Sequence, residues 1–305
     1  MPIEKFQFVN NDYLASEHID APLYSYWKSV FHKFFSSKIA IVTLIIMIVV
    51  VLMSFFQPMF SGYDLKDVSG INDFDTRYNL PSEKFWFGTD ADGKSLFDAV
   101  WAGARTSVSI GLLATLICEV LGVIIGAIWG NSKKIDHLML EVYNVISNIP
   151  QLLVVIILSY VFGSGFWNLL FAMTFTSWFK TAYLIRVQVM IMRDREYNLA
   201  SRMLGTKIWR LIIKNIFPYL ISVIITDIAK QLPEFISYEV FLSFLGVGLS
   251  ADTPSLGRII NQYSLNMTNY PYLFWIPVGV LALVTVSLYL VSQRLADASD
   301  PKTHM

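Results

Sequence analysis

The chain has 305 residues, of which 55% are apolar and 15% are charged, and its cationic and anionic side chains balance to a formal net charge of zero. Soluble globular domains usually lie near about 45–50% apolar and about 25% charged, so this composition indicates lipid as the main solvent. Neutrality gives no electrostatic basis for binding nucleic acid. A single cysteine, Cys118, and four scattered histidines exclude an internal disulfide and indicate no metal site.

The first 38 residues are polar and aromatic, and they are expected to form an amino-terminal segment without a cleavable signal. After them come six apolar runs, each near the roughly 20 residues that a helix needs to cross a bilayer. The runs cover residues 39–57, 104–130, 139–162, 166–190, 219–245 and 272–292. The sequence therefore predicts an all-α membrane protein with six transmembrane helices. Pro150 is expected to kink the third of them, because it lacks a backbone donor.

The distribution of Lys and Arg predicts the orientation of these helices. The most basic stretch lies between the fourth and fifth runs, and basic residues of short loops stay on the cytoplasmic side. Residues 1–38 and the tail 293–305 then also lie in the cytoplasm, as an even number of spans requires. Residues 58–103 lie outside the cell membrane and lean acidic.

The basic inner stretch, residues 194–218, is too polar to enter the membrane and too regular for an unstructured loop. Apolar residues recur at helical spacing within 195–204, which predicts a short helix. Gly205 permits a sharp turn, Thr206 can cap a second helix, and Pro218 marks the start of the fifth span. From the residues alone, this hairpin either rests among anionic lipid headgroups or docks a cytosolic protein.

This stretch resembles the EAA loop of ABC-importer permeases, in which Glu-Ala-Ala is followed by a Gly after three residues and later by Leu-Pro. Ala200, Gly205 and Pro218 occupy the matching positions. Three positions depart from the general pattern, where Leu199 replaces Glu, Ser201 replaces Ala and Phe217 replaces Leu.

The peptide-importer version of the loop tends to read Glu-Tyr-x-x-Ala-x-Arg-x-Leu-Gly, and the stretch that begins at Glu196 is similar to it. In that family the hairpin is a coupling helix that sits in a groove of an ATPase subunit. The resemblance implies that coupling here falls to Glu196, Ala200, Ser201, Arg202, Gly205 and Pro218.

Further segments resemble the dipeptide and oligopeptide permeases, in the same order along the chain. They are 85–93 (Phe-Trp-Phe-Gly-Thr-Asp-x-x-Gly), 103–107, 242–257 and 295–301. The tail departs at Lys302, where the family has Arg. The first 38 residues and 58–84 look most like the C-subunit of Gram-positive oligopeptide (Opp/Ami-type) systems. The resemblance implies a type I importer fold with a core permease domain over 104–292.

On this resemblance, the chain is a non-catalytic permease subunit of an ATP-driven oligopeptide importer. The implied partners are a homologous second permease subunit, two ABC ATPase subunits, an extracytoplasmic peptide-binding lipoprotein, the peptide and membrane lipid. ATP and Mg²⁺ would be bound by the ATPases, since the chain has no Gly-x-x-x-x-Gly-Lys-Ser/Thr loop and needs no cofactor of its own. The alternatives are import of another solute, such as a nickel chelate, or an ion-coupled secondary transporter, which would show paired half-helices and inverted repeats.

Charged residues within the apolar runs are the candidates for the translocation path, because charges in lipid are costly and usually face a cavity or a partner. Asp227, Gln231 and Glu234 share one face of the fifth run by their spacing. They are expected either to line the path or, for Asp227, to form an internal ion pair with Lys230. Glu119, in the second run, is expected to be paired or near the interface.

Overall fold

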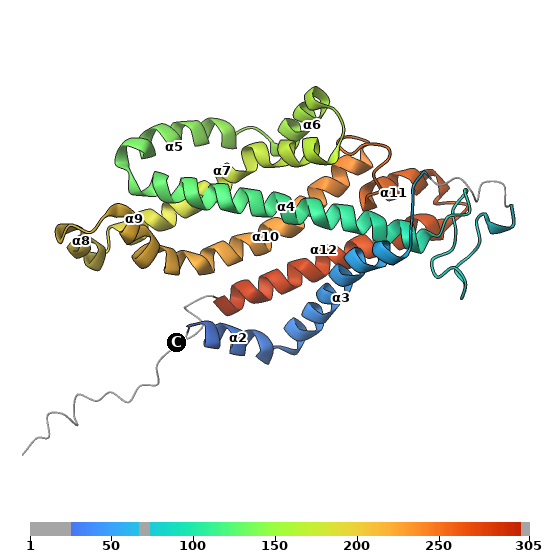
Figure 1. Ribbon diagram of the computed structural model, residues 1–305, viewed down its shortest axis with the longest axis horizontal. Coiled ribbons are helices and arrows are strands. Elements are labelled where there is room, and N and C mark those ends of the chain that lie inside the picture. The colour runs from blue at the N-terminus through green and yellow to red at the C-terminus, as the bar shows by residue number, and fades with distance from the viewer. Residues whose placement is uncertain (1–25, 67–73, 300–305) are drawn as a thin grey trace, which may run out of the picture.

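The computed structural model describes residues 26–66 and 74–299, which form a helical bundle (Figure 1). Its long helices run beside one another along the longest axis of the molecule. They are α3 (Lys38–Phe60), α4 (Leu96–Asn131), α7 (Phe166–Arg193), α10 (Phe217–Phe244) and α12 (Pro271–Ser299). A short helix, α2 (Tyr26–Ser36), precedes α3 and contacts α12. The all-helical class predicted from composition and apolar runs is confirmed.

Four helices of the described chain are long and apolar enough to cross a membrane: α3, α4, α12 and a continuous helix over Ile208–Phe244. Four of the six predicted runs lie within these helices. α7 contains the run 166–190, but its many polar and amphipathic side chains make it less apolar than the other four. At 28 residues it is about 42 Å long, which still suffices to cross a bilayer.

The third predicted span is not one kinked helix. It consists of α5 (Lys133–Ser147) and α6 (Gln151–Phe162), which meet at 82°. Pro150 explains the break, since it offers no backbone donor and disfavours helical geometry at the residue before it. The single helix expected over 139–162 is therefore corrected to a broken span. Non-helical backbone at membrane depth is tolerated only where protein or a water-filled cavity surrounds it.

Helices α4 and α7 share the most extensive contact in the bundle because three glycines of α4 face α7. A Cβ added at Gly122, Gly126 or Gly130 would lie within 2.7 Å of atoms on α7. Small residues at this spacing let two backbones approach closely in lipid. Gly122, Gly126 and Gly130 therefore set the close packing of α4 on α7.

The two ends of the bundle carry the shorter elements. At one end lie α8 (Glu196–Met203), α9 (Ile208–Leu211) and the π-helix η3 (Ile212–Ile216). At the other end lie the 3₁₀ helices η2 (Phe74–Thr76) and η4 (Ser264–Asn266) and the helix α11 (Leu256–Tyr263). Ser255 begins α11 by accepting a hydrogen bond from the Arg258 backbone N–H at 3.2 Å.

Candidate functional site

The basic stretch forms a helical hairpin whose turn depends on Gly205. This residue has φ +77°, the left-handed conformation that favours glycine. Its N–H donates to the carbonyl of Arg202 at 2.9 Å, and the N–H of Thr206 donates to the carbonyl of Ser201 at 3.0 Å. These two bonds form the Schellman motif that ends many helices. The expected cap of the second helix is wrong, since Lys207 rather than Thr206 occupies the N-cap position.

The second arm of the hairpin continues into the membrane helix without a break. α9 passes through the π-helix η3 into α10, so that Ile208–Phe244 forms one helix of 37 residues. Pro218 lies in the first turn of α10, where proline is well tolerated. Pro218 therefore marks the start of α10, as expected, although α9, η3 and α10 join without a break.

Asn198 connects both arms of the hairpin to the bundle, a role that no local sequence pattern indicates. Its side chain is fully buried and donates to the carbonyl of Met192, at the end of α7, at 2.8 Å. Its Oδ1 accepts a hydrogen bond from Asn215 on the second arm at 2.9 Å. One buried amide thus joins α7, α8 and η3.

Two arginines attach the hairpin region to the end of α4. Arg193 Nη1 donates to the carbonyl of Gly130 at 2.9 Å, and Arg193 Nε donates to Asp194 Oδ1 at 3.0 Å. This pairing lowers the pKa of the Asp194 carboxyl. Arg202 Nη2 donates to Asn131 Oδ1 at 3.1 Å, so this predicted coupling residue points toward the bundle.

The other predicted coupling residues differ in exposure. Glu196, Ala200 and Pro218 are exposed, whereas Ser201 is half-buried and donates to the carbonyl of Tyr197 at 2.8 Å. Apolar side chains project around the turn and remain uncovered. We call Met203 (90% exposed), Leu204 (87%) and Trp209 (61%) the apolar tip of the hairpin.

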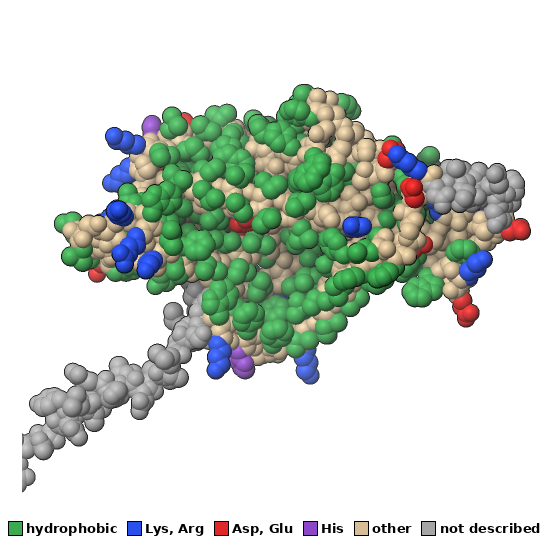
Figure 2. Space-filling view, viewed as in Figure 1, with side chains coloured by type: hydrophobic (Ala, Val, Ile, Leu, Met, Phe, Trp, Pro, Cys, Tyr) green, Lys and Arg blue, Asp and Glu red, His purple; other side chains and the backbone are tan. Residues whose placement is uncertain are grey.

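Basic side chains gather at the hairpin end of the molecule, whereas the surface along the middle is mainly hydrophobic (Figure 2). One cation near this end, Arg186, is buried instead. Its Nε and Nη2 atoms donate to Asp136 Oδ1 and Oδ2 at 2.6 and 2.9 Å. The guanidinium also lies 5.5 Å from the ring centroids of Trp129 and Tyr183. Arg186 is therefore a packing residue that ties α5 to α7.

The three predicted path residues divide into two groups. Asp227 and Gln231 lie together, with Asp227 Oδ2 accepting hydrogen bonds from Thr181 Oγ1 at 2.9 Å and from Gln231 Nε2 at 3.3 Å. Gln231 is buried. The ion pair proposed between Asp227 and Lys230 is absent from the described residues, and Lys230 is exposed.

Glu234 stands apart from these two. Its Oε2 lies 3.5 Å from the Lys180 ammonium, and its Oε1 accepts a hydrogen bond from Tyr238 at 2.9 Å. Lys180 also borders a polar cavity of about 510 Å³ at the break between α5 and α6, lined by Asn148, Gln151 and Ser177. Glu234 is therefore connected to this cavity through Lys180.

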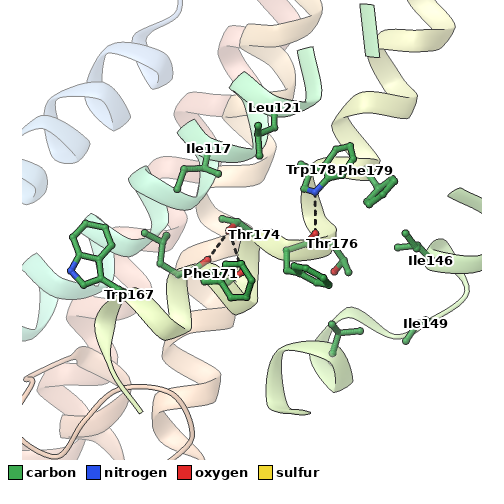
Figure 3. Close-up of a pocket in the computed structure, with 13 residues that line it drawn as sticks. Ile117, Leu121, Ile146, Ile149, Trp167, Phe171, Thr174, Thr176, Trp178 and Phe179 are labelled. Carbon is green, nitrogen blue, oxygen red and sulfur yellow. Dashed lines mark hydrogen bonds between the residues drawn. The ribbon is translucent and has the colours of Figure 1, made fainter. Parts of the chain in front are cut away.

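An apolar groove of about 840 Å³ adjoins this polar cavity, with Ile146 and Ile149 at the border of both (Figure 3). Trp167 and Phe171 line it from α7, and Ile117 lines it from α4. The bend between α5 and α6 leaves this face of α7 uncovered. The chain alone thus presents a lipophilic surface beside a polar one.

The end of the bundle opposite the hairpin, named the outer end after its predicted orientation, is organised around Asp90. Its Oδ1 accepts hydrogen bonds from the backbone N–H groups of Asp92 at 2.9 Å and Lys94 at 2.8 Å, and its Oδ2 accepts one from the Tyr263 hydroxyl at 2.8 Å. Burial, together with the charge of Asp90, raises the pKa of Tyr263. Next to it, Tyr272 donates to the carbonyl of Thr89 at 2.8 Å. The motif that resembles the outer permease segment is therefore a folded cap.

A bundle of apolar helices with a basic hairpin built onto one of them defines a multi-pass membrane transport protein. Residues 122–305 match the family described as the inner membrane component of binding-protein-dependent transport systems, and residues 25–81 match the N-terminal transmembrane domain of oligopeptide transport permease C. The chain belongs to this family of inner membrane transport components.

Curated relatives extend over almost the whole chain. The oligopeptide transport system permease protein AmiD of Streptococcus pneumoniae is 58% identical over 99% of this chain and 98% of its own length. The oligopeptide permease OppC of Bacillus subtilis is 36% identical over 94% and 93%, and the dipeptide permease DppC of the same organism is 32% identical over 99% and 94%.

Among solved structures, a chain of the MetNI methionine ABC transporter in an inward-facing conformation has a TM-score of 0.52 and 16% identity. It covers 66% of this chain and 96% of its own length. At this identity the likeness concerns the fold alone. It supports the type I importer fold that the resemblance implied.

Proposed function

We propose that this chain is the permease subunit of an ATP-driven importer of oligopeptides, which it forms with a homologous sister subunit, two ATPases and a peptide-binding lipoprotein. The oligopeptide substrate is supported by the permease C domain at residues 25–81 and by the names of the relatives. The termini and the hairpin face the cytoplasm, in keeping with the basic side chains around the hairpin.

The observation that carries the proposal is the continuity of the hairpin with α10. The apolar tip is uncovered, although the hairpin behind it is fixed by Asn198, Arg193 and Arg202. Exposed apolar groups on a rigid support are typical of a protein interface. An ATPase that grips this tip moves α9, and α10 moves with it as part of the same helix. Movement of rigid elements of this kind is how importers switch between two states.

Transport chemistry in this scheme belongs to the partners. ATP is bound and hydrolysed by the ATPase subunits, and this chain supplies no catalytic group and no cofactor. On the membrane side, Glu234, Lys180 and the polar cavity at the broken span offer hydrogen-bonding groups to the backbone and termini of a peptide. Asp227 and Gln231 lie one turn or two further along α10 toward the hairpin.

The test compares two glycines of the same geometry. Gly205 and Gly246 have φ values of +77° and +76°, each ends a helix with the same pair of backbone hydrogen bonds, and a Cβ at either position meets no atom within 4 Å. We expect Gly205→Trp to abolish uptake of radiolabelled peptide by membrane vesicles and to reduce recovery of ATPase subunits with the tagged chain. Gly246→Trp carries the same backbone strain away from the hairpin and should retain both. Equal uptake by the two variants would contradict coupling through this hairpin.

A further inference from the structure

A cluster of buried polar side chains lies between α4, α7 and α10, away from the hairpin and the polar cavity. Glu119 of α4 is only 4% exposed, and its carboxyl group lies beside that of Asp227 on α10. Thr181 of α7 and Gln231 of α10 complete the cluster and are also buried. Two carboxyl groups thus meet inside the bundle, where ionised groups are costly.

The donors of this cluster all lead to Asp227. Thr181 donates its hydroxyl proton to Asp227 Oδ2, and Gln231 Nε2 donates to both Thr181 Oγ1 (2.5 Å) and Asp227 Oδ2. In contrast, no donor among the described residues reaches either carboxyl oxygen of Glu119, and Gln231 Oε1 is equally unpartnered. A buried carboxylate without a donor is the less stable arrangement, since a hydrogen bond favours the charged form.

The charged groups around the cluster do not neutralise it. On α4 the neighbouring titratable group is the buried thiol of Cys118. On α7 the nearest cation, Lys180, pairs with Glu234 instead. On α10, Lys230 borders the same cavity as Asp227 but is exposed and forms no ion pair within the described residues. Two adjacent carboxyl groups in such surroundings cannot both ionise readily.

We propose that Glu119 and Asp227 together bind one proton, which Glu119 carries and donates to the Asp227 carboxylate. Asp227 is then the ionised member, with three donors around it: Thr181, Gln231 and Glu119. Glu119 is the neutral member, which explains why it needs no other donor. The hydrogen bond between the pair connects α10 to α4. Because Glu119 is neutral, α4 is left with no unpaired charge if α10 moves away. This proton site does not depend on the transported solute.

The test is infrared difference spectroscopy of the purified transporter in lipid, comparing wild type with Glu119→Gln. We expect the wild type to show the carbonyl stretch of a protonated carboxyl group that shifts in D₂O, and Glu119→Gln to lose it. Asp227→Asn should keep the band but move its frequency, because the hydrogen-bond acceptor changes.

The matched control is Glu239→Gln. Glu239 is fully buried in α10 and accepts a hydrogen bond from Ser243 at 2.7 Å, but it has no carboxyl neighbour. The Glu119 band should persist in this variant. An unchanged infrared spectrum in Glu119→Gln would overturn the proposal. So would a thermal unfolding midpoint that rises with Na⁺ in the wild type but not in Glu119→Gln, because that result would place a metal cation in the cluster.

Function provides an independent measurement. Gln at position 119 keeps a neutral group that can donate to Asp227, so Glu119→Gln should retain peptide uptake within about twofold of wild type. Glu119→Ala removes the donor, and we expect a clear loss of uptake and thermal stability. If Gln were as damaging as Ala, the proton assignment to Glu119 would be wrong.

Discussion

The two ends of this molecule differ in how far their side chains find contacts within the chain. At the outer end, Asp90 collects three hydrogen bonds from its own chain, and Tyr78 stacks on Tyr270 with ring centroids 3.9 Å apart. At the hairpin end, the backbone is equally well bonded, yet Met203 and Leu204 are almost fully exposed.

The difference indicates which end is complete without a partner. A buried, fully bonded polar network stabilises one conformation. An exposed apolar tip on a fixed support gains stability only when another surface covers it. The polar groups around Asp90 are therefore satisfied within the chain, whereas the apolar tip is the surface that we propose an ATPase subunit covers.

The largest effect expected from this comparison is on ATPase binding. Replacing Leu204 with Asp puts a charge into the apolar tip, and we expect peptide uptake to fall to about a tenth of the wild-type rate or less, as hot-spot substitutions do. Co-purification of ATPase subunits should fall in parallel, with the thermal unfolding midpoint unchanged. The matched control is Leu265→Asp at the outer end, where Leu265 is 93% exposed. Equal loss of ATPase in both variants would show that the tip is not the contact.

The next effect concerns the ion pair between Arg186 of α7 and Asp136 of α5, near the hairpin end. Arg186→Ala removes the cation that donates two hydrogen bonds to Asp136, and it should lower the unfolding free energy by about 2–3 kcal/mol. This loss is smaller than that expected from breaking a fully buried ion pair, because Asp136 is partly exposed. Thermal unfolding of the detergent-solubilised protein measures this loss. Lys180→Ala on the same helix removes the exposed ammonium group that lies 3.5 Å from Glu234. This change should lower the unfolding free energy clearly less than Arg186→Ala does. A similar loss in both would mean that Arg186 packs without pairing.

Features that depend on neighbouring residues in the sequence were predictable, whereas contacts between distant segments were not. Apolar runs located α3, α4, α7, α10 and α12 because the length that crosses lipid is a local property. The turn at Gly205 was likewise readable, since only glycine enters the left-handed conformation at little cost.

Contacts between distant segments were not readable from one sequence. Nothing in the sequence indicates that Arg186 pairs with Asp136, or that Arg193 donates to the carbonyl of Gly130. Glu119 and Asp227 gave no sign of meeting, because nothing local specifies which helices are neighbours. Pro150 indicated a disturbance in the third span, but the 82° angle depends on how α5 and α6 pack on α7.

A smaller effect should follow from changing the outer cap. Tyr263→Phe removes the hydrogen bond to Asp90 and should cost about 1.5 kcal/mol, the lower end for a bond to a charged group. Because the pKa of Tyr263 is raised in the folded protein, its contribution is complete below the unfolded value of about 10 and is lost as pH rises above it. The wild type should therefore lose more stability than Tyr263→Phe between neutral and strongly alkaline pH. Tyr270→Phe, which keeps its stacking on Tyr78, serves as the control.

The smallest effect separates the buried bonds of the cap from its surface ion pair. Lys66 and Asp252 lie 2.9 Å apart, but both side chains are mostly exposed, so solvent and salt screen their attraction. Lys66→Gln should leave the unfolding midpoint unchanged at physiological salt. Lys94→Gln should lower it measurably, because Lys94 Nζ donates to the carbonyl of Leu65 at 2.6 Å and is partly buried. If Lys66 proved the more important lysine, the stability of the outer end would rest on surface charge rather than on its internal hydrogen bonds, and the contrast with the hairpin would need another basis.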